Sequence, residues 1–305
     1  YFHVVFTLPA EINALALRNP ALIYDLLFRS ASQTLLRLTG DPRRLGVQPG
    51  ITAVLHTWGQ NLMLHPHVHC VVTAGGLCAD GSRWSHGKKG YLLPVMVLGS
   101  LYRGKFLDGL HRAWKAGKIA LKGSTAELAD PVAWAAYKDR LYQKDWVVYA
   151  KRPFGGVEQV FRYLGRYTHR VAISNHRLQS LSADKVTFTL KDYADDGRRK
   201  TMTLTGVEFL RRFLLHVLPK GFVRIRHYGL NAPCNVKTRL ETARRHLEKT
   251  QVDRHQPSVT LADLPWHERF LALTGIDVMA CPRCGGRLVI VEPLISMPAR
   301  APGGP

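Results

Sequence analysis

The 305 residues contain 43 Lys and Arg against 22 Asp and Glu, which gives a formal net charge of +21 and a pI near 10.1. An excess of this size disfavours a compact state unless a polyanion shares it, so nucleic acid is the expected partner. No run of 18 apolar residues suggests a membrane span, and five cysteines are too few for a disulfide framework. Composition therefore argues against a membrane protein and a disulfide-rich secreted scaffold, and a reducing cytoplasm is the default location.

Apolar spacing along the chain predicts an α+β fold in which an antiparallel sheet packs against helices. Strands are expected at 1–8, 51–58, 66–73, 145–150, 185–193, 200–205 and 222–228, and helices at 11–38, 95–117, 131–141 and 206–217. Residues 1–230 are expected to form one main domain with a helical insertion near 95–142. Residues 231–305 are expected to form a basic extension whose Pro/Gly/Ala-rich end is disordered.

Three histidines alternate in the segment 64–72, at His65, His67 and His69. A period of two is the side-chain period of a β-strand, so the three imidazoles are expected on one face. Imidazole is the commonest metal-ligating side chain, and three buried imidazoles without partners would be costly. The spacing therefore predicts a metal site, with a polar sheet rim as the alternative interpretation.

The third ligand of this predicted site has two candidates. His56 lies in a second strand-like segment, and Gly59-Gln60-Asn61 is the expected turn between the two strands. If the hairpin closes near residues 61–64, His56 falls opposite His69 and on the same face. Gln60 shares the parity of His56 and is the alternative ligand. His65 is the weaker histidine because Pro66 marks the start of its strand.

The run from Gly99 to Lys105 fits the phosphate-loop pattern G-x-x-x-x-G-K. Residue 106 is Phe where that loop needs a metal-binding Ser or Thr. The apolar spacing of this stretch predicts an amphipathic helix instead. We therefore expect no nucleotide cofactor.

A predicted helix that follows Gly156 carries a pair of tyrosines. Tyr163 and Tyr167 are four residues apart, so their hydroxyls should lie on one helix face, among Arg162, Arg166 and Arg170. Cations and a polarised phosphate favour the phenolate over the phenol, which makes the two tyrosines candidate nucleophiles. Two aromatic residues packed on the core are the alternative interpretation. Arg166 and Arg170, with Arg162, are candidate phosphate ligands or else a solvated basic face.

Cys281 and Cys284 have the spacing of half a zinc ribbon. A structural zinc ion needs four ligands, and no second Cys-x-x-Cys follows this knuckle. His267 is a conceivable further ligand. The pair is thus either an incomplete zinc site, completed from elsewhere, or a reduced turn.

Taken together, these segments resemble the HUH single-strand endonucleases and, more closely, their two-tyrosine rolling-circle transposases, the insertion-sequence ninety-one family. The resemblance rests on His67-Val68-His69 and on the pair Tyr163 and Tyr167. It extends to the amino-acid sequences of residues 55–62, 65–70 and 163–170. It covers nearly the whole chain. Family members usually begin with a cysteine-rich zinc-binding domain that has no match here, and the chain starts at Tyr1, so a fragment is expected.

This resemblance implies an HUH-like antiparallel sheet with flanking helices that carry the tyrosine pair. It implies a transposase that nicks and rejoins single-stranded DNA at the ends of a mobile element, in the bacterial cytoplasm and at the nucleoid when bound to DNA. A divalent cation, Mg²⁺ or Mn²⁺, on His67, His69 and His56 would align the scissile phosphate. One tyrosine would attack to form a 5′-phosphotyrosyl enzyme, and the second would act at the other end, without a nucleotide cofactor.

Two other functions stay open at this point. A zinc-dependent hydrolase on the same histidines would need a carboxylate base, and no Asp or Glu lies between His56 and His69. A non-catalytic basic DNA-binding remnant of a mobile element would bind DNA without covalent attachment.

Overall fold

The computed structural model describes residues 1–87, 90, 92–151, 165, 172–192, 195–251, 264–281 and 284–289. The chain divides into two compact units, Tyr1–His255 and Gln256–Pro305. Among the described residues, no helix is both long and apolar enough to cross a membrane.

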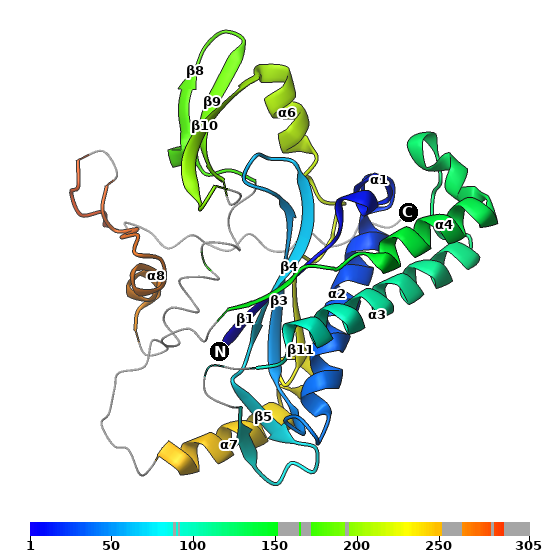
Figure 1. Ribbon diagram of the computed structural model, residues 1–305. Coiled ribbons are helices and arrows are strands. Elements are labelled where there is room, and N and C mark those ends of the chain that lie inside the picture. The colour runs from blue at the N-terminus through cyan, green and yellow to red at the C-terminus, as the bar shows by residue number, and fades with distance from the viewer. Residues whose placement is uncertain are drawn as a thin grey trace, which may run out of the picture. The chain divides into compact units, whose positions relative to one another are not determined.

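A five-stranded sheet forms the centre of the first unit (Figure 1). Its strands follow the order β11 (Ile225–Gly229), β3 (Gly50–Trp58), β4 (Leu64–Val72), β1 (Phe2–Thr7) and β7 (Val148–Lys151). All four neighbouring pairs are antiparallel. The predicted α+β class with an antiparallel sheet is confirmed at this level.

One face of this sheet is apolar and carries the core. Even-numbered residues of β1, such as Phe2, Val4 and Phe6, are almost fully buried, because strand residues two apart share a face. They pack on four helices, α1 (Asn13–Arg18), α2 (Pro20–Gly40), α3 (Val95–Lys115) and α4 (Pro131–Gln143), which lie along this side of the sheet in Figure 1. Burial of these side chains is the main stabilising term of the unit.

Helix boundaries follow local chemistry. Pro20 occupies the first turn of α2, where a missing backbone N–H costs nothing. The Asp130 carboxylate accepts a hydrogen bond from the Ala133 N–H at 2.8 Å and caps α4, which also begins with proline. These helices confirm the predicted ones at 11–38, 95–117 and 131–141.

Two three-stranded sheets extend the first unit. One has the order β10 (Arg198–Thr205), β9 (Lys185–Asp192) and β8 (Leu178–Leu181) and packs on α6 (Gly206–Leu214) through Phe188 and Phe209. The other has the order β2 (Val47–Gln48), β5 (Gly75–Cys78) and β6 (Trp84–His86) and contacts α7 (Arg239–Gln251). Both arrangements are again antiparallel.

The second unit contains α8 (Trp266–Thr274), which ends at Gly275 with a φ of 73°, a left-handed conformation that glycine adopts without strain. Helices α7 and α8 were not among the predicted elements, because the apolar pattern after residue 231 is weak.

The β3–β4 hairpin was predicted, but its register was wrong by two residues. His56 lies opposite His67, and Val54 lies opposite His69. The turn spans residues 59–63 and the register shifts between His56 and Trp58, so the strands close around residues 61 and 62 instead of 61–64. A shift of two residues preserves the face, so the expected parity of the histidines is confirmed.

Candidate metal centre

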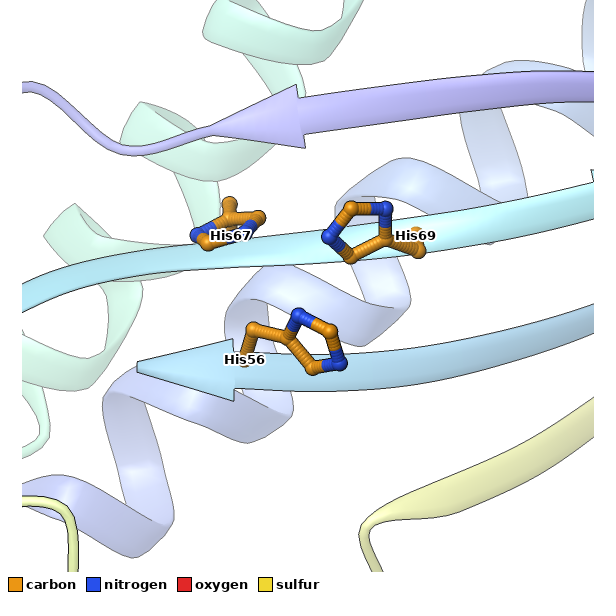
Figure 2. A group of neighbouring side chains, drawn as sticks. All are labelled: His56, His67 and His69. Atoms are coloured by element: carbon orange, nitrogen blue, oxygen red, sulfur yellow. The ribbon is translucent and has the colours of Figure 1, made fainter. Parts of the chain in front are cut away.

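Three histidines meet on the face of the central sheet opposite the core. His56 comes from β3, and His67 and His69 come from β4; one nitrogen of each lies within 4.8 Å of the others. Figure 2 shows the three rings side by side on the two neighbouring strands. His56 and His67 are direct cross-strand neighbours, and His69 is the diagonal neighbour two residues further along β4. This group can hold a metal ion.

The position of each ring is fixed by a second contact. The Nδ1 of His67 lies 2.6 Å from the His65 carbonyl oxygen, which requires Nδ1–H to donate. That tautomer leaves the Nε2 lone pair of His67 as the ligand atom. His56 stacks on Trp58 with 4.7 Å between ring centroids, and its centroid lies 4.4 Å from that of His69. The rings therefore have defined orientations before any ligand arrives.

His3 is a further member of the site, which the sequence did not reveal. Its Nε2 lies 2.8 Å from the Nδ1 of His69, and the two rings stack with an interplanar angle of 2°. In the tautomer in which His69 Nδ1–H donates to His3, the Nε2 of His69 keeps its lone pair for a metal. The predicted strand 1–8 indicates which face His3 lies on. The contact between His3 and His69, however, depends on the β1–β4 register, which pairs Val5 with His69.

The electrostatics of the cluster keep the imidazoles of His67 and His69 neutral. Burial, followed by the neighbouring histidines, lowers the pKa of His67 to about 4, although its hydrogen bond to the His65 carbonyl acts in the opposite direction. Burial and the charges of His67, His56 and His3 likewise hold the pKa of His69 well below its usual range. Only a neutral imidazole has a lone pair to offer, so no proton has to leave these two rings for a metal to bind near neutral pH.

The cluster lines a cavity of about 560 Å³. Trp58, Gln60 and Leu64 from the hairpin border it, as do Lys191 and Asp192 from β9. Three histidine ligands beside an open cavity would leave coordination positions for a substrate oxygen or water, as in catalytic rather than structural metal sites.

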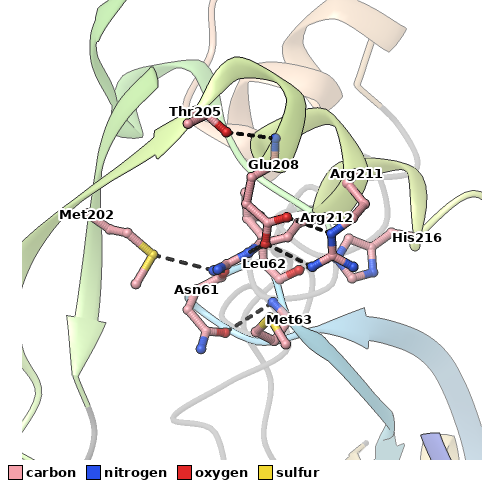
Figure 3. A network of polar contacts seen from close by, with 9 residues as sticks. All are labelled: Asn61, Leu62, Met63, Met202, Thr205, Glu208, Arg211, Arg212 and His216. Carbon is pink, nitrogen blue, oxygen red and sulfur yellow. Dashed lines mark hydrogen bonds and ion pairs between the residues drawn. The ribbon is translucent and has the colours of Figure 1, made fainter. Parts of the chain in front are cut away.

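The turn that joins the two histidine-bearing strands is held by donors in and beside α6 and directly before β8. Three consecutive carbonyl oxygens of the turn each accept a hydrogen bond: Gln60 from Arg177, Asn61 from Arg212 at 3.0 Å, and Leu62 from His216 at 3.0 Å. The α6 part of this network is drawn in Figure 3, where Glu208 also pairs with Arg212. Leu62 is fully buried with a φ of 61°, a strained conformation that the surrounding contacts must maintain.

The remaining predicted site residues are distributed as follows. Gln60 lines the cavity, but its Oε1 accepts a hydrogen bond from the Lys191 N–H at 3.5 Å. His65 is exposed at the entry of β4. Five predicted residues lie outside the described part of the chain, namely Tyr163, Tyr167, Arg162, Arg166 and Arg170.

The cysteine knuckle lies in the second unit. Cys281 and Cys284 form no disulfide, and the Cys281 carbonyl accepts a hydrogen bond from the Gly285 N–H at 2.8 Å, as expected of a turn. Within the described ranges, the histidine trio is the one group of three or more such metal-ligating side chains. Zinc at the knuckle stays a prediction.

Comparison with known proteins identifies a family. Residues 50–239 match the family model described as "Putative transposase" (Y2_Tnp). The chain is 47% identical over 293 residues to "Putative transposase y4qJ" of Sinorhizobium fredii, covering 96% of this chain and 73% of that protein. The chain belongs to this transposase family.

A second relative of the transposase is more distant. It is the "Transposase for insertion sequence element IS801" of Pseudomonas savastanoi pv. phaseolicola, 27% identical over 303 residues that cover 94% of this chain and 66% of the relative. No solved structure matches the chain. The matched region, residues 50–239, includes the three histidines and the residues that hold their turn.

We expect His3→Ala to weaken Mn²⁺ binding by this transposase about 10- to 100-fold, the usual effect of losing a group that orients a metal-ligating histidine. His3→Gln, whose amide oxygen can accept from His69, should recover part of the affinity. Isothermal titration calorimetry measures both. His227→Ala is the matched control, because His227 is an exposed histidine that contacts Thr52 and is not part of the metal-ligating trio. Parent-like affinity in His3→Ala would contradict this role.

Arg212→Ala should lower the free energy of unfolding by about 1.5–3 kcal/mol, because it removes a charged donor from the partly buried Asn61 carbonyl. Arg212 is only 17% exposed and bonds both Glu208 and the Asn61 carbonyl. Arg211→Ala is the control: Arg211 pairs with the same Glu208 but is 53% exposed, so solvent screens its ion pair and its loss should change stability much less. Urea denaturation compares the two. Equal losses would show that the turn does not depend on Arg212.

Proposed function

We propose that this chain carries the catalytic part of a transposase that nicks and rejoins single-stranded DNA through a 5′-phosphotyrosyl intermediate, in rolling-circle-type transposition. One observation carries the proposal: a trio of histidines beside an open cavity, on an antiparallel sheet, in a member of the Y2_Tnp family. The sheet with its helix-covered face would then be an HUH-type fold. The net charge of +21 fits a DNA substrate.

The donor set fits a divalent cation. His56, His67 and His69 would hold it, since their ligand atoms converge within 4.8 Å and the second nitrogens of His67 and His69 are engaged elsewhere. Bound Mg²⁺ or Mn²⁺ would polarise the scissile phosphate and align it. Imidazole nitrogens favour Mn²⁺ over Mg²⁺, whose preferred ligands are oxygens.

The chemistry itself would belong to the tyrosines. The phenolic oxygen of Tyr163 or Tyr167 would attack the phosphorus, the bond from phosphorus to the 3′-oxygen would break, and the departing 3′-oxygen would take up a proton. The phosphodiester energy is retained in the tyrosyl ester, so a 3′-hydroxyl can later attack it and rejoin the strand without a nucleotide cofactor. Arg162, Arg166 and Arg170 would bind the phosphate.

Replacing Tyr163 and Tyr167 together by Phe should abolish covalent protein–DNA adducts and leave DNA affinity within about twofold, because charge dominates that affinity. Each single Phe variant should retain part of the activity. The measurement uses 5′- and 3′-labelled single-stranded oligonucleotides, Mn²⁺ and a denaturing gel. Adducts that persist in the double variant would exclude these tyrosines. Tight binding with no adduct in the parent would support the non-catalytic remnant instead.

Alanine at His67 or His69 should remove Mn²⁺ binding and DNA cleavage together, because two nitrogens alone make a weak site. His65→Ala is the matched control, since it lies on the same strand at an exposed position. Calorimetric titration with Mn²⁺ also decides the third ligand: His56→Ala should match His67→Ala, whereas the Gln60 alternative requires Gln60→Ala to do so. Undiminished affinity in His67→Ala and His69→Ala would make the trio a polar sheet face only.

A further inference from the structure

The cations of the β9–β10 hairpin divide between its two faces. On one face Lys200 lies 2.8 Å from Asp192 and 3.1 Å from Asp195, and Arg198 lies 3.7 Å from Asp195. The hydrogen bonds that the Lys200 ammonium donates to both carboxylates raise the pKa of Lys200. These charges are neutralised within the hairpin and need no external partner.

The opposite face carries unneutralised charge. Lys191 and Arg199 are directly opposite each other in the antiparallel register, and both are exposed. Within the part of the chain that the structure describes, neither makes an ion pair with a carboxylate. Like charges placed directly across two strands destabilise a hairpin, so this pair costs stability unless an anion lies between its members.

The other strand residues that the structure describes on this face are polar, and none of them is Asp or Glu. Its remaining residues alternate with the apolar ones that pack on α6, and they are Lys185, Thr187 and Thr189 on β9 and Thr201, Thr203 and Thr205 on β10. Hydroxyls and cations are the groups that contact phosphate and sugar without reading the bases. The face spans about 20 Å from Lys185 to Lys191, at about 3.3 Å per residue.

This face begins at the histidine site. Lys191 lines the same cavity as the trio, and its backbone N–H donates to Gln60 in the hairpin turn. In Figure 1 the β8–β10 sheet stands beyond the turn end of β3 and β4. A strand whose phosphate lies at the trio can therefore continue from Lys191 along β9 and β10.

We propose that this face, which we call the Lys191–Arg199 track, binds the phosphate backbone of the single-stranded DNA that leads into the histidine site. The proposal rests on the proposed function for the identity of the anion. A phosphate placed between Lys191 and Arg199 makes charge-assisted hydrogen bonds to both and relieves their repulsion. The contacts are independent of base sequence and add affinity rather than specificity.

The test compares two pairs of substitutions with the same change in net charge. Lys191→Gln with Arg199→Gln removes the two opposed cations of the track and leaves Lys185 in place. Arg198→Gln with Lys200→Gln removes the neutralised cations on the other face of the same hairpin. Affinity for a fluorescent single-stranded 30-mer is measured by anisotropy over a salt series. The track pair should weaken binding at least tenfold at low salt and reduce the slope of log K against log salt by about 1.4, the equivalent of two phosphate contacts.

The control pair should leave this slope close to that of the parent. The melting temperature of the track variant should be unchanged or higher than that of the parent, because a repulsion has been removed. The melting temperature of the control variant should be lower, because it loses ion pairs. An unchanged slope in the track pair, or equal changes in both pairs, would overturn the proposal. Covalent adduct formation is read separately at saturating DNA. If the parent protein forms no adduct, the proposed function is wrong. A track variant that still forms adducts but has the reduced salt slope supports the track.

Discussion

The antiparallel register of β3 against β4 is the constraint on which the site depends. A period of two puts His56, His67 and His69 on one face, and the pairing of His56 with His67 brings them within ligand distance. A slip of one residue would move the β4 histidines into the helix-packed core and place Val68 and Cys70 at the cavity. Both faces of the strand therefore specify the register, since the same slip would expose the apolar side chains and bury the imidazoles.

Several contacts hold that register from outside the hairpin. The neighbouring strand β1 supplies His3 on the site face and Phe2, Val4 and Phe6 on the core face. The turn is bound by Arg177, Arg212 and His216, which belong to segments more than 110 residues further along the chain. A turn with a buried residue at positive φ would be a weak point on its own. The β8–β10 sheet and α6 make it a fixed boundary of the cavity.

The sequence predicted much of this because its strongest signals are local. Strand parity, the helical apolar spacing of 95–117 and the turn at Gly59-Gln60-Asn61 need only neighbouring residues, and the structure confirms each of them. The predicted cross-strand partner of His56 was wrong, because the register shift between His56 and Trp58 depends on how the turn is held. His3 and the donors to the turn were not found, because their contacts span 66 to 154 residues. Helix α7 was missed because it buries little beyond Ala243, against Leu77 and Leu230.

The central sheet and the β9–β10 hairpin each have two chemically different faces. The central sheet has one face that packs on the helices and another whose three imidazoles line a cavity. The β9–β10 hairpin has one face whose cations are neutralised by Asp192 and Asp195 and another where Lys191 opposes Arg199 without a carboxylate. The histidine trio and Lys191 line the same cavity, so a phosphate ester bound at the trio would lie beside Lys191. Packing of the inward faces therefore stabilises the fold, while the outward faces carry the groups that are suited to bind a ligand.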